Sequence, residues 1–293
     1  MIPPDPEKSG DGPGPGQDSG APQRSDVPAR KLKITVSYDG TGYSGWQRQS
    51  NAPSVQQVIE EALNRVTGSP VRIHGAGRTD AGVHAIGQTA HFTTSSGMVE
   101  PELKKALNAV LPDDIRVRSL ERTDESFHAR FSALGKTYAY AIRNHPDDSV
   151  TDRHYHWHVR QALDVSSMRE AASLLLGCRD FRAFASVPTG KDSRRTLRRL
   201  DLQVLGPGIL VFAEADGFLW KMVRGLVGSL VEVGKGAREP TWPRSLQDAP
   251  DRGAGAPSAP AKGLTLMWVD YGGGPPDPSD LSPCLSGFFL AAR

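Results

Sequence analysis

The chain has 293 residues, of which 38% are hydrophobic and 23% charged, and its formal net charge is +2 at pH 7. This is the composition of one large globular domain or two of ordinary size. No apolar run approaches the length of a membrane span, and the two cysteines, Cys178 and Cys284, cannot build a disulfide framework. We therefore expect an intracellular, reducing compartment; the sequence leaves the cytoplasm, the mitochondrion and the nucleus open.

Residues 1–30 differ from the rest of the chain and are expected to be a disordered tail. They hold seven prolines and five glycines with no periodic apolar pattern, so they cannot bury enough surface to fold. Five acidic and three basic residues give the tail a net charge of −2, so the remainder, +2 less −2, carries +4. That mildly basic remainder fits an anionic partner, whereas the tail is too acidic for a mitochondrial presequence.

An N-terminal half over 31–145 reads as strands interleaved with helices. Alternating apolar and polar residues predict a strand over 31–38, and a capping-box pattern with an apolar stripe predicts a helix over 54–68. Further strands are expected around 71–73, 88–93, 115–120 and 136–142, with a second helix over 101–110. The order of these elements is typical of an α+β unit with a mainly antiparallel sheet.

A C-terminal half over 146–275 repeats this rhythm. We expect a strand over 154–159, a helix over 164–176, a hairpin turning at 206–208, a helix over 219–233 and a strand over 264–271. Residues 238–263 read as a proline-rich linker or loop, and 276–293 as a C-terminal tail segment. The predicted fold is α+β: two pseudo-duplicated halves around a mixed, mainly antiparallel sheet with helices packed on it, and a ligand cleft between the halves.

A glycine-rich loop over 75–85 lies between two expected strands and carries Arg78, Thr79 and Asp80 among three glycines. Such a backbone turns tightly and lets a ligand approach closely. It lacks the third glycine of a dinucleotide loop and the Gly-Lys-Ser/Thr of a P-loop, so nucleotide binding is rejected. An ordinary Asp-Gly turn has the same composition, and the residues by themselves favour that turn.

Three other patterns each leave two interpretations open. His154, His156 and His158 would share one strand face, which favours a wet sheet surface over a metal site because few other ligands are near. The tyrosines of Lys136-Thr137-Tyr138-Ala139-Tyr140 fit either core packing or base stacking. The densest basic cluster is either a solvated face or a track for RNA phosphates; it comprises Arg194, Arg195, Arg198 and Arg199, with Lys191 beside them.

Arg224 lies at the margin of the apolar stripe of the helix expected over 219–233. A cation in that position needs an anionic partner. Asp80 is the natural candidate, although the two residues are far apart in the sequence.

Ordered motifs over 31–271 resemble the TruA family of tRNA pseudouridine synthases. The motifs are Tyr38-Asp39-Gly40 through Gly45-Trp46-Gln47-Arg48-Gln49, Ala76-Gly77-Arg78-Thr79-Asp80-Ala81-Gly82-Val83-His84, Phe127-His128-Ala129-Arg130-Phe131-Ser132-Ala133, Lys136-Thr137-Tyr138, Phe181 to Phe184, Met222-Val223-Arg224 with Gly228-Ser229-Leu230, and Ala261-Lys262-Gly263-Leu264. Because so many motifs occur in the family's order, the loop is interpreted as a functional loop rather than as an ordinary turn. The resemblance implies the pseudouridine synthase fold and a homodimer that presents a basic cleft to tRNA.

The resemblance also implies a reaction without cofactor or metal, the isomerisation of a specific uridine in tRNA. Asp80 would be the catalytic nucleophile, which must be ionised, and the cations Arg78 and Arg224 would favour that form. Arg78 would also fill the space of the extruded nucleotide. Tyr138 would pack on the uracil and help to move the proton from C5, and Leu264 would line the pocket.

The sequence departs from the family pattern at two places. Trp220 and Lys221 stand where the family helix commonly has two histidines, and the proline-rich 238–263 segment replaces a more regular approach to Leu264. Neither departure touches Asp80, but both bear on RNA contacts. The alternative is a catalytically weak or inactive RNA-binding protein with the same fold; a hydrolase would need a second carboxylate, and none is placed near the loop.

Overall fold

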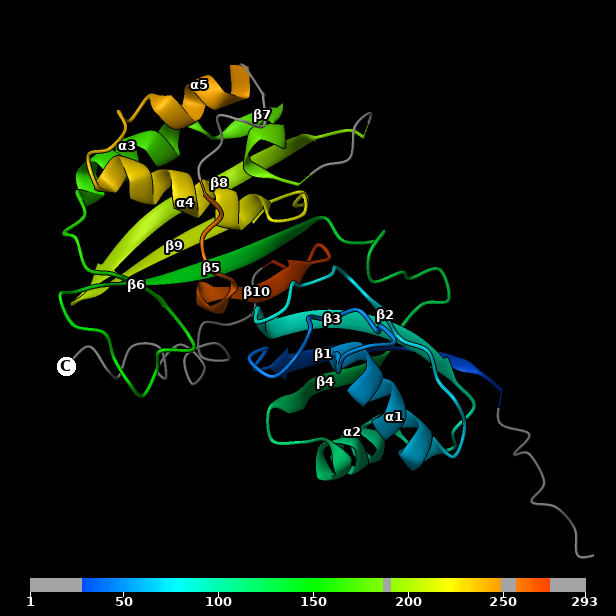
Figure 1. The fold of residues 1–293 in the computed structure, drawn as a ribbon. Helices are drawn as coiled ribbons and strands as arrows, with labels where there is room; N and C mark the ends of the chain where they lie inside the picture. Colours follow the sequence, from blue (N-terminus) through cyan, green and yellow to red (C-terminus); the bar gives the residue numbers. More distant parts are fainter. Residues whose placement is uncertain (1–27, 187–190, 249–256, 275–293) are drawn as a thin grey trace, which may run out of the picture.

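The structure is a computed structural model that describes residues 28–186, 191–248 and 257–274. In those residues the strands form one continuous sheet that runs through both halves, in the order β4-β1-β3-β10-β5-β9-β8-β7, with β2 paired to β3 and β6 to β5 (Figure 1). The strands are β1 (Arg30–Tyr38), β2 (His74–Gly75), β3 (His84–Thr94), β4 (Ile115–Arg122), β5 (Gly135–Asn144), β6 (Trp157–Val159), β7 (Gly177–Asp180), β8 (Arg194–Leu205), β9 (Gly208–Ala215) and β10 (Leu264–Asp270).

The sheet is mixed but mainly antiparallel, as predicted. Only β10 with β3 and β5 with β6 run parallel among the pairings of the described strands. β10 lies at the junction of the halves, parallel to β3 and antiparallel to β5. The last described strand therefore fills the centre of the sheet, so that Leu264 lies near residues from both halves.

Helices α1 and α2 pack on the N-terminal part of the sheet, and α3, α4 and α5 gather on the C-terminal part (Figure 1). Their bounds are α1 (Val55–Thr67), α2 (Glu100–Val110), α3 (Val165–Leu174), α4 (Met222–Gly234) and α5 (Trp242–Asp248), with short 3-10 turns η1 (Arg182–Phe184) and η3 (Ala261–Gly263). One hydrophobic cluster extends from the α1–β1 region to the α3–α4 region. Apolar contact along its whole length holds the two halves together. None of the described helices is long and apolar enough to cross a bilayer.

Sequence signals set several of these boundaries directly. The Ser54 hydroxyl caps α1 by accepting the Gln57 N–H at 3.4 Å, and Gly68 ends the helix at φ 71°, a conformation that favours glycine. Asp164 caps α3 through the N–H groups of Ser166 and Ser167. The hairpin of β8 and β9 turns where it was predicted.

Several predicted boundaries were wrong. The strand before the glycine-rich loop is His74–Gly75 rather than 71–73. The strand expected over 154–159 is confined to Trp157–Val159. The helix expected from 219 begins at Met222, because Lys221 has a left-handed backbone with φ 65°. The strand expected from 31 begins at Arg30.

The segment 238–263 is not simply a linker or loop. It contains α5 and η3 on either side of 249–256, which lie outside the described residues. Proline is compatible with the first turn of a helix, and Pro243 occupies that part of α5 while Leu246 is buried. Proline content therefore failed as a sign of irregular structure here. The predicted tail segments lie largely outside the described residues.

Candidate active site

The glycine-rich loop is fixed on both sides of Asp80. The Thr79 hydroxyl meets the buried Tyr38 hydroxyl at 2.8 Å, and the Thr79 carbonyl accepts the Trp46 N–H at 3.1 Å. Gly45 lies so close that an added Cβ would be 2.4 Å from the Thr79 carbonyl oxygen, and its φ is 89°, so only glycine fits there. These contacts hold the backbone while the Asp80 side chain projects from it.

Arg224 is the ion-pair partner of Asp80, as the sequence suggested. Its Nη1 lies 2.9 Å from the Asp80 Oδ2, and the two side chains are only 15% and 22% exposed. The guanidinium is itself held by a 2.7 Å bond from Nε to the Ala259 carbonyl. The pair joins the loop of one half to α4 of the other, and its partial burial strengthens the attraction.

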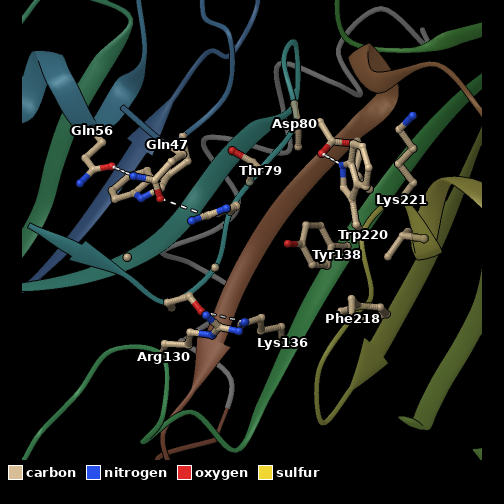
Figure 2. Close-up of a pocket in the computed structure, with 18 of the residues that line it drawn as sticks. Gln47, Gln56, Thr79, Asp80, Arg130, Lys136, Tyr138, Phe218, Trp220 and Lys221 are labelled. Atoms are coloured by element: carbon tan, nitrogen blue, oxygen red, sulfur yellow. Dashed lines mark hydrogen bonds between the residues drawn. The ribbon is translucent and has the colours of Figure 1, made fainter. Parts of the chain in front are cut away.

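Trp220 is the second partner of the carboxylate, and the sequence did not reveal it. Its indole Nε1–H donates to the Asp80 Oδ1 at 2.8 Å (Figure 2). With Arg224 on the other oxygen, both ends of the carboxylate have a donor. The available signal was an aromatic residue immediately before the helix that carries Arg224, but the direction of its ring depends on the Lys221 backbone.

Tyr138 and Leu264 form part of the wall close to Asp80. The Tyr138 ring meets Phe218 edge-on, with centroids 5.2 Å apart, and burial raises the pKa of its phenol. Leu264, at the start of β10, is 7% exposed. Both residues line the same cavity as Asp80, which provides an apolar surface on which a base can pack.

Two further cations flank the loop. Arg78 is exposed, and its Nε donates to the neutral side-chain amide of Gln47 at 3.1 Å, whereas Asp80 forms its ion pair with Arg224. Lys136 donates to the Ala76 carbonyl at 2.9 Å. Burial, aided by the charges of Arg130 and Arg195, lowers the pKa of Lys136 to about 8. The sequence predicted that Lys136 lies on the same strand as Tyr138, but it did not predict the contact of Lys136 with the loop.

The cavity around these residues has a volume of about 1380 Å³, beyond the usual range for small-ligand sites, roughly 300–1,000 Å³. Residues from both halves line it, as expected of a cleft between them. Asp80 is the one acid among the described lining residues, and six Lys and Arg side chains line the same cavity: Arg72, Arg78, Arg130, Lys136, Lys221 and Arg224. The basic lining favours a polyanion over a neutral small molecule.

Two other groups of residues singled out in the sequence, the arginine cluster and the three histidines, are not among the described lining residues of this cavity. Arg194, Arg195, Arg198 and Arg199 lie on β8, outside the described lining, and Arg199 forms a salt bridge with Asp201. His154, His156 and His158 do not share a strand: the first two precede β6, and the rings of His156 and His158 approach Asp148. In the described parts of the chain, no three His, Cys, Asp or Glu side chains are arranged so that they could hold a metal ion.

Comparison with known proteins places this site in a family. The tRNA pseudouridine synthase family model matches residues 34–132 and 171–272, a span that includes the Asp80 loop, Arg224 and Leu264. The chain belongs to this family, the TruA group of pseudouridine synthases, whose members are intramolecular isomerases, and its fold is the pseudouridine synthase fold.

Individual relatives agree with this assignment. The chain is 45% identical over 243 residues to the tRNA pseudouridine synthase A of Brevibacillus brevis, covering 83% of this chain and 100% of the relative. It is 42% identical over 244 residues to the tRNA pseudouridine synthase A 2 of Clostridium perfringens, with 83% and 100% covered. For the tRNA pseudouridine synthase A of Syntrophotalea carbinolica the identity is 44% over 243 residues, with 82% and 96% covered.

Proposed function

We propose that this protein converts a specific uridine of tRNA to pseudouridine, with Asp80 as the nucleophile. The observation that carries the proposal is the Asp80–Arg224 ion pair, 2.9 Å long, within a basic cavity. The Arg224 guanidinium compensates the negative charge that a carboxylate nucleophile carries. The tRNA substrate follows from the family and from the excess of cations that surround Asp80.

The reaction is an isomerisation and needs no external reactant. The Asp80 carboxylate attacks the nucleoside, the glycosidic C–N bond breaks, and uracil leaves with that electron pair. After the ring turns, its C5 forms the new C–C bond to the sugar, the bond to Asp80 breaks, and the proton on C5 is transferred to N1. Substrate and product contain the same atoms. The site therefore has to supply only positioned side chains and no second reactant.

The remaining side chains have distinct proposed roles. Tyr138 packs on the uracil and takes part in moving the C5 proton, and Leu264 closes the apolar side of the pocket. Arg78 is exposed in the cavity lining and hydrogen-bonded to the Gln47 side-chain amide, and it enters the space that the extruded nucleotide leaves. Arg224 remains with Asp80.

A homodimer is part of the same proposal. The family resemblance supports it: two copies would present a longer basic surface to one tRNA than a single chain can. Sedimentation of the purified protein at micromolar concentration tests this point. We expect twice the mass of one chain, and a single-chain mass with full activity would remove the dimer from the proposal.

The reaction is tested with a tRNA transcript labelled with tritium at C5 of uridine. Wild-type protein should release tritium to water and leave pseudouridine in the RNA, whereas Asp80→Asn should bind the tRNA without releasing label, because an amide cannot act as the nucleophile. Binding without release by the wild type would indicate the inactive RNA-binding alternative. Free uracil would indicate a hydrolase.

A further inference from the structure

Trp220 is a large aromatic side chain that is 60% exposed and yet held in one place. The bond that holds it is the indole N–H to the Asp80 Oδ1 at 2.8 Å. The hydrogen bond, rather than burial, holds the ring in this position. The contact is with the carboxylate that the proposed chemistry uses.

The backbone around Trp220 is arranged to aim the ring at Asp80. The Trp220 carbonyl accepts the Ser186 N–H at 2.9 Å, and the Lys221 carbonyl accepts the Gly225 N–H, also at 2.9 Å, at the start of α4. Between these anchors Lys221 has φ 65°, and it is the one non-glycine residue with a positive φ in the described chain. Such a conformation is unfavourable for lysine and is retained mainly where the surroundings enforce it.

The ring is also approached by a cation. The Lys221 Nζ lies 4.8 Å from the Trp220 ring centroid, close enough for a cation–π attraction. Figure 2 shows Trp220 beside Lys221, with the indole directed toward Asp80, and Tyr138 and Phe218 are part of the same cavity wall. The pair therefore lines the cavity in which the proposed reaction takes place.

Two donors at opposite oxygens determine how the carboxylate can turn. Arg224 bonds Oδ2 and Trp220 bonds Oδ1, so rotation of the carboxylate plane would break at least one bond. Each oxygen accepts two hydrogen bonds, so one lone pair on each stays open for attack. A neutral N–H orients the carboxylate without adding a second positive charge that would oppose its reaction with the sugar.

We propose that Trp220 is a positioning residue that fixes the Asp80 carboxylate for attack on the nucleoside, an inference that rests on the proposed function. Reaction rates depend steeply on the orientation of a nucleophile. A group that only orients Asp80 should affect the chemical step and leave RNA affinity almost unchanged. Replacing a residue needed for folding would lower the stability of the protein, and replacing a residue that stacks on RNA would raise the dissociation constant.

The test is single-turnover formation of pseudouridine at saturating tRNA, with the dissociation constant measured separately. Trp220→Phe keeps an aromatic ring and removes the N–H, and we expect a rate about tenfold lower with a dissociation constant within about twofold, since one hydrogen bond has that order of effect. Trp220→His should restore most of the rate, because imidazole Nε2–H has the same position in its ring as indole Nε1–H. Trp242→Phe on α5 is the matched control and should leave the rate unchanged.

Each other outcome has a definite meaning. A Trp220→Phe rate equal to or above that of the wild type would overturn the positioning role. So would a loss that appears only in the dissociation constant, which would make Trp220 an RNA-stacking residue, or a failure of Trp220→His to recover. If wild-type protein binds tRNA but forms no pseudouridine, the proposed function fails first and the positioning role fails with it.

Discussion

At the scale of single residues, the site depends on how each polar group of Asp80 is satisfied. The carboxylate lies between a cation on Oδ2 and a neutral donor on Oδ1. The loop backbone beside it is held by Tyr38 and Trp46. Preorganised donors of this kind lower a barrier because they do not have to reorganise during the reaction. The orientation of the proposed nucleophile is therefore set by its neighbours as much as by its own side chain.

Replacing Tyr138 with phenylalanine should separate catalysis from binding. Burial raises the pKa of the Tyr138 phenol, so the hydroxyl is protonated at neutral pH and can take part in a proton relay. In Tyr138→Phe the ring still packs on uracil, and we expect the single-turnover rate to fall by about 10²-fold or more, the range of general acid–base contributions. The tRNA dissociation constant should stay within about twofold. An unchanged rate would remove the hydroxyl from the proton pathway.

Lys136 should give the protein a pH-dependent stability at alkaline pH. Its pKa is lowered by burial from 10.5 to about 8, so above pH 8 the unfolded chain holds this proton more strongly than the folded protein. The free energy of unfolding contributed by this group therefore rises between pH 8 and 10.5.

Lys136→Met removes the titrating group and keeps a similar shape. Subtracting its free energy of unfolding from that of the wild type should give a difference that is flat below pH 8 and rises toward pH 10.5. Denaturant unfolding at intervals of half a pH unit measures it. Parallel profiles for the two proteins would show that Lys136 is not buried as described.

At the scale of elements, α4 carries Arg224 and must lie close to its neighbours. A Cβ on Gly225 would be 2.1 Å from the Phe184 carbonyl oxygen, and one on Gly228 would be 2.0 Å from that of Pro257. The glycines let the helix approach η1 and the segment that leads to Leu264. The apolar face of α4 was predictable from its 3.6-residue period. Its start was not, because the left-handed Lys221 follows from tertiary contacts and leaves no mark in the sequence.

Gly225→Ala tests this close approach. Alanine in a helix interior is normally more stable than glycine by about 1 kcal/mol, but here the added methyl group clashes with backbone. We expect a net loss of about 1–3 kcal/mol, the usual cost of overpacking, together with a slower reaction as Arg224 is displaced. Gly42→Ala is the control, since nothing lies within 4 Å of its added Cβ, and equal or greater stability of Gly225→Ala would contradict the packing described.

At the scale of the whole molecule, the site exists because β10 and α4 return to the loop of the N-terminal half. The resemblance to a known family pointed to Asp80, Arg224, Tyr138 and Leu264, and the structure places all four around one cavity. Sequence patterns also predicted the mixed sheet and the repeated layout. They could not show Trp220 on Asp80 or Lys136 on Ala76, because these contacts join segments through side-chain directions that a one-dimensional pattern does not contain.

The basic cluster on β8 is either a solvated face or a track for RNA phosphates, and salt dependence distinguishes the two. If it tracks RNA phosphates, its removal should flatten the dependence of tRNA affinity on salt by about one unit of slope for each lost contact. The variant replaces four arginines with glutamine: Arg194, Arg195, Arg198 and Arg199. Its control replaces Lys104 and Lys105 of α2. An unchanged slope would make the cluster a solvated face, since Arg199 already has Asp201 as a partner.

In the proposed function, the protein isomerises specific uridines in tRNA with Asp80 as the nucleophile. The most direct measurement is transcriptome-wide mapping of pseudouridine in cells that lack this protein, rescued with the wild type or with Asp80→Asn at equal abundance. We predict that discrete tRNA uridines lose the modification and that only the wild type restores them. Restoration by Asp80→Asn, or an unchanged set of pseudouridines in cells without the protein, would contradict the account.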